Sequence, residues 1–173
     1  GEGFVDIKKT NGTSGEINKI WGNRVWAMRK VDSVLHPDGG SGSPMRTSIT
    51  SDPKYKLDVR YNVFEDLLTQ PISYIEGAHL GEGFHTVAYN VIANVKGGNT
   101  VLWLPTEYTE VYLNTVVDTA SAGYLFDWTR FTSPSDILGF DAKGNCFIDG
   151  NASGFQLEGN LDANSDFNHN AFI

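Results

Sequence analysis

The chain of 173 residues carries a formal net charge of −8 at pH 7, and 40% of its residues are hydrophobic. This length and composition predict a globular chain with a substantial core. The negative charge argues against nucleic acid as a partner, because a phosphate backbone would be repelled. No apolar run approaches the roughly 20 residues of a membrane helix, so membrane insertion is not expected. A single cysteine, Cys146, excludes an intrachain disulfide framework.

The N-terminal part combines candidate strands with glycine-rich loops. Residues 3–9 predict a short strand. Residues 17–34 are ambiguous, because their apolar residues fit either helical spacing or the alternation of a strand. Gly22 and Asn23 suit a turn and interrupt a helix, so a hairpin is favoured there. Residues 36–44 hold several glycines and prolines and predict an exposed loop, either a recognition loop or an inert connection.

The next segment predicts a strand, a helix and a second strand. Residues 54–61 alternate between apolar and charged side chains, as an amphipathic strand does. Residues 62–69 predict a short helix, because Asn62 is a good N-cap and the apolar residues that follow share one helical face. Residues 72–75 predict a further short strand.

The centre of the chain, residues 86–128, predicts an antiparallel sheet. Residues 86–95 alternate with period two and predict one half-buried strand. Gly97 and Gly98 can adopt the positive φ angles of a tight hairpin, after which residues 100–104 return as the next strand. Residues 110–117 and 123–128 predict two more strands. Adjacent strands joined by short turns are therefore expected to pair antiparallel.

The character of the chain changes after residue 136. From residue 137, glycines separate short apolar pieces, which predicts very short strands or tight hairpins. Residues 162–173 hold little apolar content and predict an exposed tail that is ordered by a partner or an ion. We therefore divide the chain into a main β-sandwich domain, residues 1–136, and a short-strand extension, residues 137–173, which packs on the same domain or on a neighbouring subunit.

The fold class that follows is all-β. Many short strands with turn residues about every ten positions, and at most one or two short helices, favour an antiparallel β-sandwich or a jelly-roll-like domain. Alternating strand and helix units are not indicated. The sequence shows no long repeat, only a weak echo between residues 149–153 and 162–166.

Two Asp- and Asn-rich loops are candidate calcium sites. Oxygen side chains at alternate positions can converge on one hard cation, and calcium is the cofactor that this pattern suggests. Neither loop carries the glutamate that completes a standard calcium loop, so hydrogen-bonded turns are the alternative interpretation. The candidate metal ligands are Asp149, Asn151, Asp162, Asn164 and Asp166.

The sequence offers little for catalysis. His79, Glu82 and His85 are close enough in sequence to bind a transition metal, but their spacing matches no zinc signature, so a surface loop is favoured. No strained nucleophile motif surrounds a serine, and Cys146 is expected to be a structural thiol. A hydrolase needs two opposed carboxylates, and with 21 acidic residues a pair can always be chosen. No catalytic residue is assigned, and an enzyme is the less favoured interpretation.

Exposed aromatic residues suggest binding instead. The C–H face of a sugar packs on an aromatic ring while Asp and Asn bind its hydroxyl groups, and 12% of the residues are aromatic. Trp103 and Trp128 are expected in the core. The candidate ligand-binding residues on the surface are Trp21, Trp26, Tyr108 and Tyr112.

Residues 140–145, Phe-Asp-Ala-Lys-Gly-Asn, and the Gly- and Asn-punctuated run to Asn160 resemble the short turns of phage-type tail-fibre and spike proteins. The resemblance implies a non-enzymatic structural and adhesive module at a virion or appendage surface, which is extracellular, forms a homotrimer and binds a cell-surface glycan or receptor. The alternative is a monomeric carbohydrate-binding, lectin-like β-sandwich that depends on calcium. The mass of the native assembly separates the two.

Overall fold

The computed structural model describes the strands and one of the corners that join them in each turn of the chain. No helix occurs among the described residues, and all of the strand pairs are parallel. The described residues are 5–7, 17–26, 45–49, 56–67, 72–76, 85–95, 100–103, 109–117, 124–128, 139–148, 155–157 and 165–173.

The strands form three six-stranded sheets, which we call sheets A, B and C. Sheet A contains β1 (Val5–Ile7), β4 (Met45–Ile49), β7 (Ile72–Glu76), β10 (Thr100–Trp103), β13 (Tyr124–Trp128) and β16 (Phe155–Leu157). Sheet B contains β2 (Ile17–Trp21), β5 (Lys56–Arg60), β8 (His85–Ala88), β11 (Thr109–Tyr112), β14 (Asp141–Lys143) and β17 (Asp166–Asn168). Sheet C contains β3 (Arg24–Trp26), β6 (Val63–Leu67), β9 (Val91–Val95), β12 (Thr115–Val117), β15 (Cys146–Ile148) and β18 (Ala171–Phe172).

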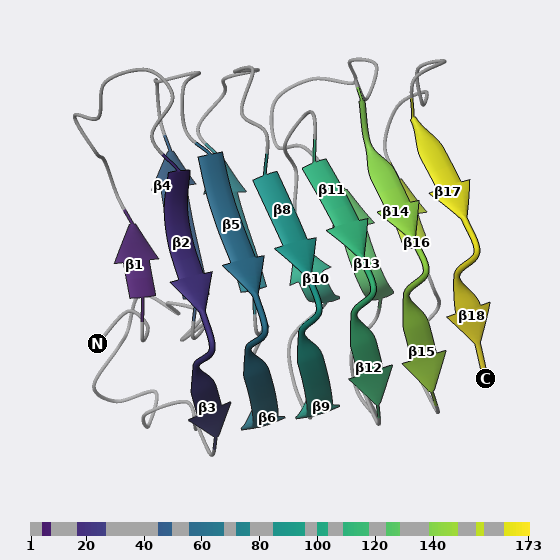
Figure 1. Ribbon diagram of the computed structural model, residues 1–173, viewed down its shortest axis with the longest axis horizontal. Helices are drawn as coiled ribbons and strands as arrows, with labels where there is room; N and C mark the ends of the chain where they lie inside the picture. Colours follow the sequence, from purple (N-terminus) through teal and green to yellow (C-terminus); the bar gives the residue numbers. More distant parts are fainter. Residues whose placement is uncertain are drawn as a thin grey trace.

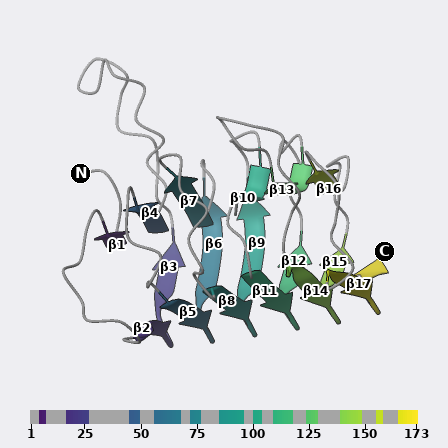
Figure 2. The same ribbon diagram turned by 90° about the horizontal axis from the view of Figure 1, so that it is seen from above.

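Successive strands go to sheets A, B and C in turn, so the chain winds into six coils that each add one strand to every sheet. The coils stack along the long axis of the molecule, from β1–β3 at one end to β16–β18 at the other (Figure 1). Seen from above, sheet A lies across from the part of the coil where sheets B and C meet (Figure 2). This architecture is a parallel β-helix, a solenoid in which each coil pairs only with its neighbours.

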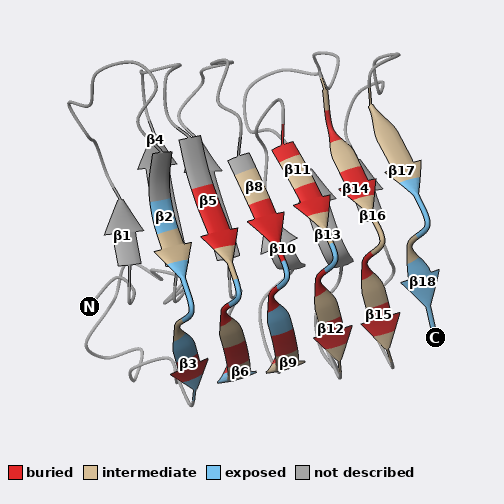
Figure 3. Ribbon diagram, viewed as in Figure 1, coloured by how far each residue is buried: buried red, intermediate tan, exposed pale blue. Residues whose placement is uncertain are grey.

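Residues at equivalent positions in successive coils stack on one another and form columns inside the coil. Inside sheet B the column is Ile20, Val59, Val87, Val111, Ala142 and Phe167, each in register with the next. Inside sheet C it is Val25, Phe64, Ile92, Val116, Phe147 and Phe172. The middle members of both columns are buried, and so is Val25, whereas Ile20 and Phe167 are partly open and Phe172 is exposed (Figure 3). Burial of these apolar columns is the main favourable contribution to the stack.

The corner between sheets B and C is built from two residues in every coil. The first has a positive φ angle, between 55° and 68°, and the second is an asparagine. The positive-φ residues are Gly22, Tyr61, Tyr89, Leu113, Gly144 and His169, and the asparagines are Asn23, Asn62, Asn90, Asn114, Asn145 and Asn170. The left-handed conformation turns the chain sharply between the two sheets.

The six asparagines form a ladder inside this corner. From Asn23 to Asn145, each backbone N–H donates to Oδ1 of the asparagine in the next coil at 3.0 Å. Each Nδ2 also donates to that Oδ1, and from Asn62 onward Nδ2 donates in addition to a backbone carbonyl of the preceding coil at 2.8–2.9 Å. Asn62, Asn90, Asn114 and Asn145 are each 1% exposed. Their buried amides are therefore fully satisfied, as a buried polar group requires.

The predicted antiparallel sandwich or jelly roll is wrong, because every pair of strands is parallel. The predicted strand 86–95 is two strands, β8 and β9, which the corner at Tyr89 and Asn90 sends into different sheets. Residues 110–117 divide in the same way at Leu113 and Asn114. The predicted hairpins also fail: β2 and β3 lie in different sheets, as do β9 and β10, and residues 96–99 lie outside the described part.

The predicted helix 62–69 is wrong, because Val63–Leu67 is strand β6. Phe64 and Leu67 are both buried although they are three residues apart, since Asp66 between them has φ 57° and kinks the strand. Asn94 produces the same spacing between Ile92 and Val95 in β9. A kinked strand therefore imitates the spacing of a helix.

Several strand predictions are confirmed, including those at 3–9, 54–61, 72–75 and 123–128. The short strands predicted after residue 137 are also present. Within the predicted tail, residues 168, 169 and 171–173 are exposed, but the chain itself orders it: β17 pairs with β14 and β18 pairs with β15, so residues 166–172 complete the last described coil. Pairing of β11 with β14 joins the two parts of the chain that the sequence divided at residue 136.

Candidate functional site

An exposed aromatic ridge follows the corner between sheets B and C over four coils. It consists of Trp21, Tyr61, Tyr89 and Tyr112. The ring centroids of Trp21 and Tyr61 are 6.2 Å apart, those of Tyr61 and Tyr89 are 5.2 Å apart, and those of Tyr89 and Tyr112 are 5.8 Å apart. The middle pair is stacked at 19° and the two outer pairs are nearly perpendicular. Four consecutive rings therefore form one continuous surface along the stack of coils.

The ridge is open to solvent over most of its length. Trp21 is 45% exposed, Tyr61 54% and Tyr89 40%, and the neighbouring corner residue Leu113 is 49% exposed. Lys19 Nζ lies 4.6 Å from the Trp21 ring centroid, and Arg60 Cζ lies 5.8 Å from that of Tyr112, so cation–π contacts hold both ends. A contiguous exposed apolar surface of this kind on a folded protein marks a candidate interaction site.

The outward face of sheet B beside the ridge carries a row of carboxylates, which we call the acidic row: Asp58, Glu110, Asp141 and Asp166. Thr86 separates Asp58 from Glu110, and the last three members are direct register neighbours. Register neighbours in a sheet lie about 4.8 Å apart. The negative charges are therefore concentrated on one side of the stack.

Two basic residues of the next outward row are already paired with these carboxylates. Arg60 Nε donates to Asp58 Oδ1. Lys143 Nζ lies 3.0 Å from Asp141 Oδ2 and 3.3 Å from Asp166 Oδ2, and so bridges two coils. The hydrogen bond to Asp141 is the main cause that raises the pKa of Lys143, with Asp166 acting in the same direction.

Burial also affects the groups between the ridge and the acidic row. Burial raises the pKa of the Tyr112 hydroxyl, and the nearby Arg60 opposes this only in part. Burial works against the charge of Arg60, but the hydrogen bond to Asp58 and the field of Tyr112 outweigh it, so the pKa of Arg60 is raised as well. Both groups therefore keep their protons at neutral pH.

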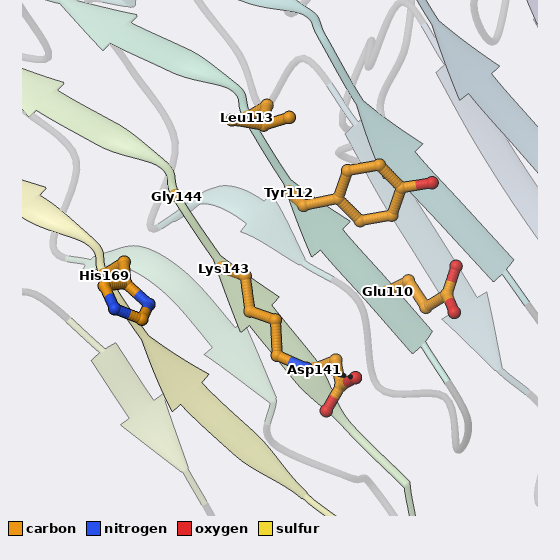
Figure 4. A pocket seen from close by; sticks show the side chains of 7 residues that line it. All are labelled: Glu110, Tyr112, Leu113, Asp141, Lys143, Gly144 and His169. Atoms are coloured by element: carbon orange, nitrogen blue, oxygen red, sulfur yellow. Dashed lines mark hydrogen bonds and ion pairs between the residues drawn. The ribbon is translucent and has the colours of Figure 1, made fainter.

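The ridge leads into an open depression of about 550 Å³ over coils four to six. It is lined by Glu110, Tyr112, Leu113, Asp141, Lys143, Gly144 and His169 (Figure 4). Tyr112 belongs to both the ridge and the depression. Asp141 Oδ1 is buried and has no hydrogen-bond partner, whereas Oδ2 of the same carboxylate binds Lys143. The volume lies within the range of ligand-binding pockets.

The structure brings together two of the four predicted ligand-binding residues, Trp21 and Tyr112. Trp26 is 62% exposed on sheet C, where it contacts the Arg24 side chain, and it makes no ring contact with the ridge among the described residues. Tyr108 lies outside the described residues. Tyr61 and Tyr89 were not assigned to a site, although the signal was present: each is an aromatic residue directly before an asparagine that follows a strand.

The calcium assignment falls mostly on residues that the structure does not describe, namely Asp149, Asn151, Asp162 and Asn164. Asp166 is described, and its carboxylate pairs with Lys143. Among residues whose positions are given, no group of three or more acidic, histidine or cysteine side chains is arranged to hold a metal. Calcium binding at the two loops stays a prediction.

The other candidate groups give no second site. His79 and Glu82 lie outside the described residues, and His85 begins β8. Cys146 is a partly buried free thiol at the start of β15. No helix suited to crossing a membrane is found in the part of the chain that the structure describes.

No protein-family model, curated protein or solved structure matches this chain. Its function is therefore inferred from the geometry of the ridge, the acidic row and the depression.

Proposed function

We propose that this protein is a non-enzymatic, surface-presented adhesive module, of the fibre or spike type, that binds an extended glycan along the aromatic ridge. The observation that supports this most is the unbroken series of four rings from Trp21 to Tyr112, of which the first three are exposed and Tyr112 is partly buried. Sugar C–H groups pack on aromatic surfaces, and the tyrosine hydroxyls can exchange hydrogen bonds with sugar hydroxyls.

The spacing of the ridge suits a polymer. Successive coils are about 4.8 Å apart, because that is the distance between paired strands. This distance is close to the length of one sugar in an extended chain, so each coil can present one ring to one sugar. A rigid array needs no rearrangement on binding, which favours affinity.

The backbone at the corner supports a role for these side chains beyond folding. A residue other than glycine in the left-handed conformation costs about 1–2 kcal/mol. Gly22 and Gly144 avoid this cost, whereas Tyr61, Tyr89, Leu113 and His169 bear it. The second left-handed row, in sheet C, carries Asp66 and Asn94, which tolerate this conformation better. Strain at exposed aromatic positions is typical of functional surfaces.

A glycan array, followed by isothermal titration calorimetry with the best polysaccharide, tests the proposal. Tyr61→Gly and Tyr89→Gly are the informative variants, because glycine already occupies the same corner position in two other coils. We expect each variant to lose affinity by about tenfold or more, the loss typical of truncating an aromatic anchor at an interface.

Trp26→Ala is the matched control, since it removes an exposed tryptophan that lies on sheet C outside the ridge. We expect its affinity to equal that of the unmodified protein. Binding that survives removal of both ridge tyrosines would overturn the proposal, and so would the absence of any glycan ligand. The homotrimer suggested by the resemblance to fibre proteins stays a prediction, which native mass spectrometry tests.

A further inference from the structure

The depression at the end of the ridge has more hydrogen-bond acceptors than donors. Glu110 and Asp141 line it, and Asp166 adjoins Asp141 on the next strand. The one lysine in its lining, Lys143, is held by Asp141 and Asp166. His169 lies at the corner of the last coil and is exposed. Two carboxylates, Asp141 and Asp166, therefore share one ammonium group.

Two carboxylates in the lining have oxygen atoms that can accept further hydrogen bonds. Asp141 Oδ1 takes no hydrogen bond although it is buried. Glu110 Oε2 takes one long hydrogen bond, 3.3 Å, from the Thr86 hydroxyl. The two residues are register neighbours on β11 and β14, so their side chains leave the same outward face side by side. Because Asp141 Oδ1 is closed to solvent, a ligand that supplies positively charged donors would reach Glu110 and the Oδ2 atom of Asp141, beside Lys143.

We propose that the depression binds the protonated amino group of an amino-sugar polymer, whose chain continues along the aromatic ridge. This inference rests on the proposed glycan-binding function and specifies its ligand class. The ammonium group donates to Glu110 and Asp141, and the sugar beside it packs against Tyr112 at the junction of ridge and depression. A charge-assisted hydrogen bond is stronger than the bond that a neutral hydroxyl makes to the same carboxylate.

The same arrangement excludes acidic glycans. A uronate or a sulfate would lie against the acidic row, where Arg60 and Lys143 are already paired with carboxylates. The acidic group of such a glycan and the carboxylates of the acidic row carry like charges, which repel at close contact. The carboxylates would also gain no hydrogen-bond donor from it. A simple polycation such as polylysine satisfies the carboxylates but has no sugar ring to place on Tyr112 or Tyr89.

Calorimetry with glucosamine oligomers and N-acetylglucosamine oligomers of matched length tests the inference, in a buffer acidic enough to protonate the sugar amine. We expect the glucosamine oligomer to bind about tenfold more tightly, and this preference to weaken at high salt because ionic contacts are screened. The double variant Glu110→Gln, Asp141→Asn should bind both oligomers equally. Thermal unfolding of the variant shows whether the fold is retained, and the single variant Glu110→Gln provides a second measurement.

The possible outcomes distinguish failure of the amino-sugar inference from failure of the proposed glycan-binding function. Equal affinity for the two oligomers, or tighter binding of a uronate oligomer, overturns the amino-sugar inference while glycan binding stands. Polylysine that binds as tightly as the glucosamine oligomer, with no effect of Tyr89→Gly, also overturns it and indicates a general polycation surface. Absence of binding by either oligomer, together with a negative glycan array, overturns the proposed function itself.

Discussion

Asn90 and Asn114 lie one above the other inside the corner of sheets B and C, and two hydrogen bonds join them. The backbone N–H and Nδ2 of Asn90 both donate to Oδ1 of Asn114 at 3.0 Å. Each amide in the ladder thus fixes the backbone of one coil on the side chain of the next. Because Tyr61 and Tyr89 directly precede two of these asparagines, this ladder also holds the middle rings of the ridge in position.

Removing a central amide should destabilise the protein strongly. Asn90→Ala leaves the backbone N–H of Asn62 and the carbonyl of Val59 without partners in a buried site. We expect a loss of about 3 kcal/mol in the free energy of unfolding, since each unsatisfied buried group costs about 1–3 kcal/mol. Urea unfolding measures it. The control is Asn168→Ala on strand β17, where the side chain is exposed; an equal loss there would contradict the role of the ladder.

The loss in the free energy of unfolding should depend on the position of the substituted asparagine in the ladder. Asn170 is at the end of the series and partly exposed, and no following asparagine accepts from its amide, which donates to the Ala142 carbonyl. Asn170→Ala is therefore expected to cost less than Asn90→Ala, because water can reach the groups that it leaves unpaired. Urea unfolding of both variants under one set of conditions compares them. A larger loss at Asn170 would show that the last coil controls the stability of the whole stack.

The two corner glycines should differ in their response to alanine. Gly22 and Gly144 have φ angles of 68° and 64°, and a Cβ at Gly22 meets no atom within 4 Å. A Cβ at Gly144 lies 3.0 Å from Leu113 Cδ2. Gly22→Ala is expected to cost about 1 kcal/mol from the left-handed backbone alone. Gly144→Ala should cost somewhat more, and the excess should vanish when Leu113→Ala is combined with it in a double-mutant cycle. Thermal unfolding provides the measurement.

The contribution of the ring contacts to the stability of the fold should be measurable separately from the contribution of the ridge to glycan binding. Stacked aromatic pairs contribute about 0.5–1.5 kcal/mol beyond their area burial. In a double-mutant cycle of Tyr61→Gly and Tyr89→Gly, we expect a coupling energy of this size in unfolding experiments. The single variants should unfold near the midpoint of the unmodified protein, because glycine relieves the left-handed strain that the lost contact offsets. A collapse of stability in either single variant would assign these tyrosines to folding.

The ion pairs of Lys143 predict a dependence of stability on alkaline pH. Hydrogen bonding to Asp141 raises the pKa of Lys143 above its ordinary value of 10.5, so the folded state holds this proton more tightly than the unfolded state. The contribution is fully present below that ordinary value and is lost as the pH rises through the folded pKa. Urea unfolding of the protein and of Lys143→Met should give a constant difference between about pH 7 and pH 9. That difference should shrink above pH 10.5. A difference that persists there would exclude the ammonium as its source.

Part of the ridge could have been found from the sequence. The pattern of an apolar residue, two variable residues, an asparagine, one variable residue and an apolar residue occurs in all six described coils, at Ile20–Val25, Val59–Phe64, Val87–Ile92, Val111–Val116, Ala142–Phe147 and Phe167–Phe172. It marks the corner, and the ridge residues stand one or two positions before the asparagine. The pattern was missed because the asparagines are separated by 24 to 39 residues, so no fixed period appears. Trp21 and Tyr112 were chosen as exposed aromatics, whereas Tyr61 and Tyr89 were placed within strands.

The sequence by itself determined where many of the strands occur, because alternation of apolar and polar residues encodes which side of a strand is buried. It did not determine which strands pair, since the same alternation serves parallel and antiparallel neighbours. That was decided by the tertiary structure, in which Tyr89 adopts a left-handed conformation and Asn90 bonds to a residue one coil away. Such a corner is stable only when the next coil supplies the acceptor. The acidic row and the aromatic ridge exist for the same reason: stacking brings residues from separate coils to neighbouring positions on one outward face.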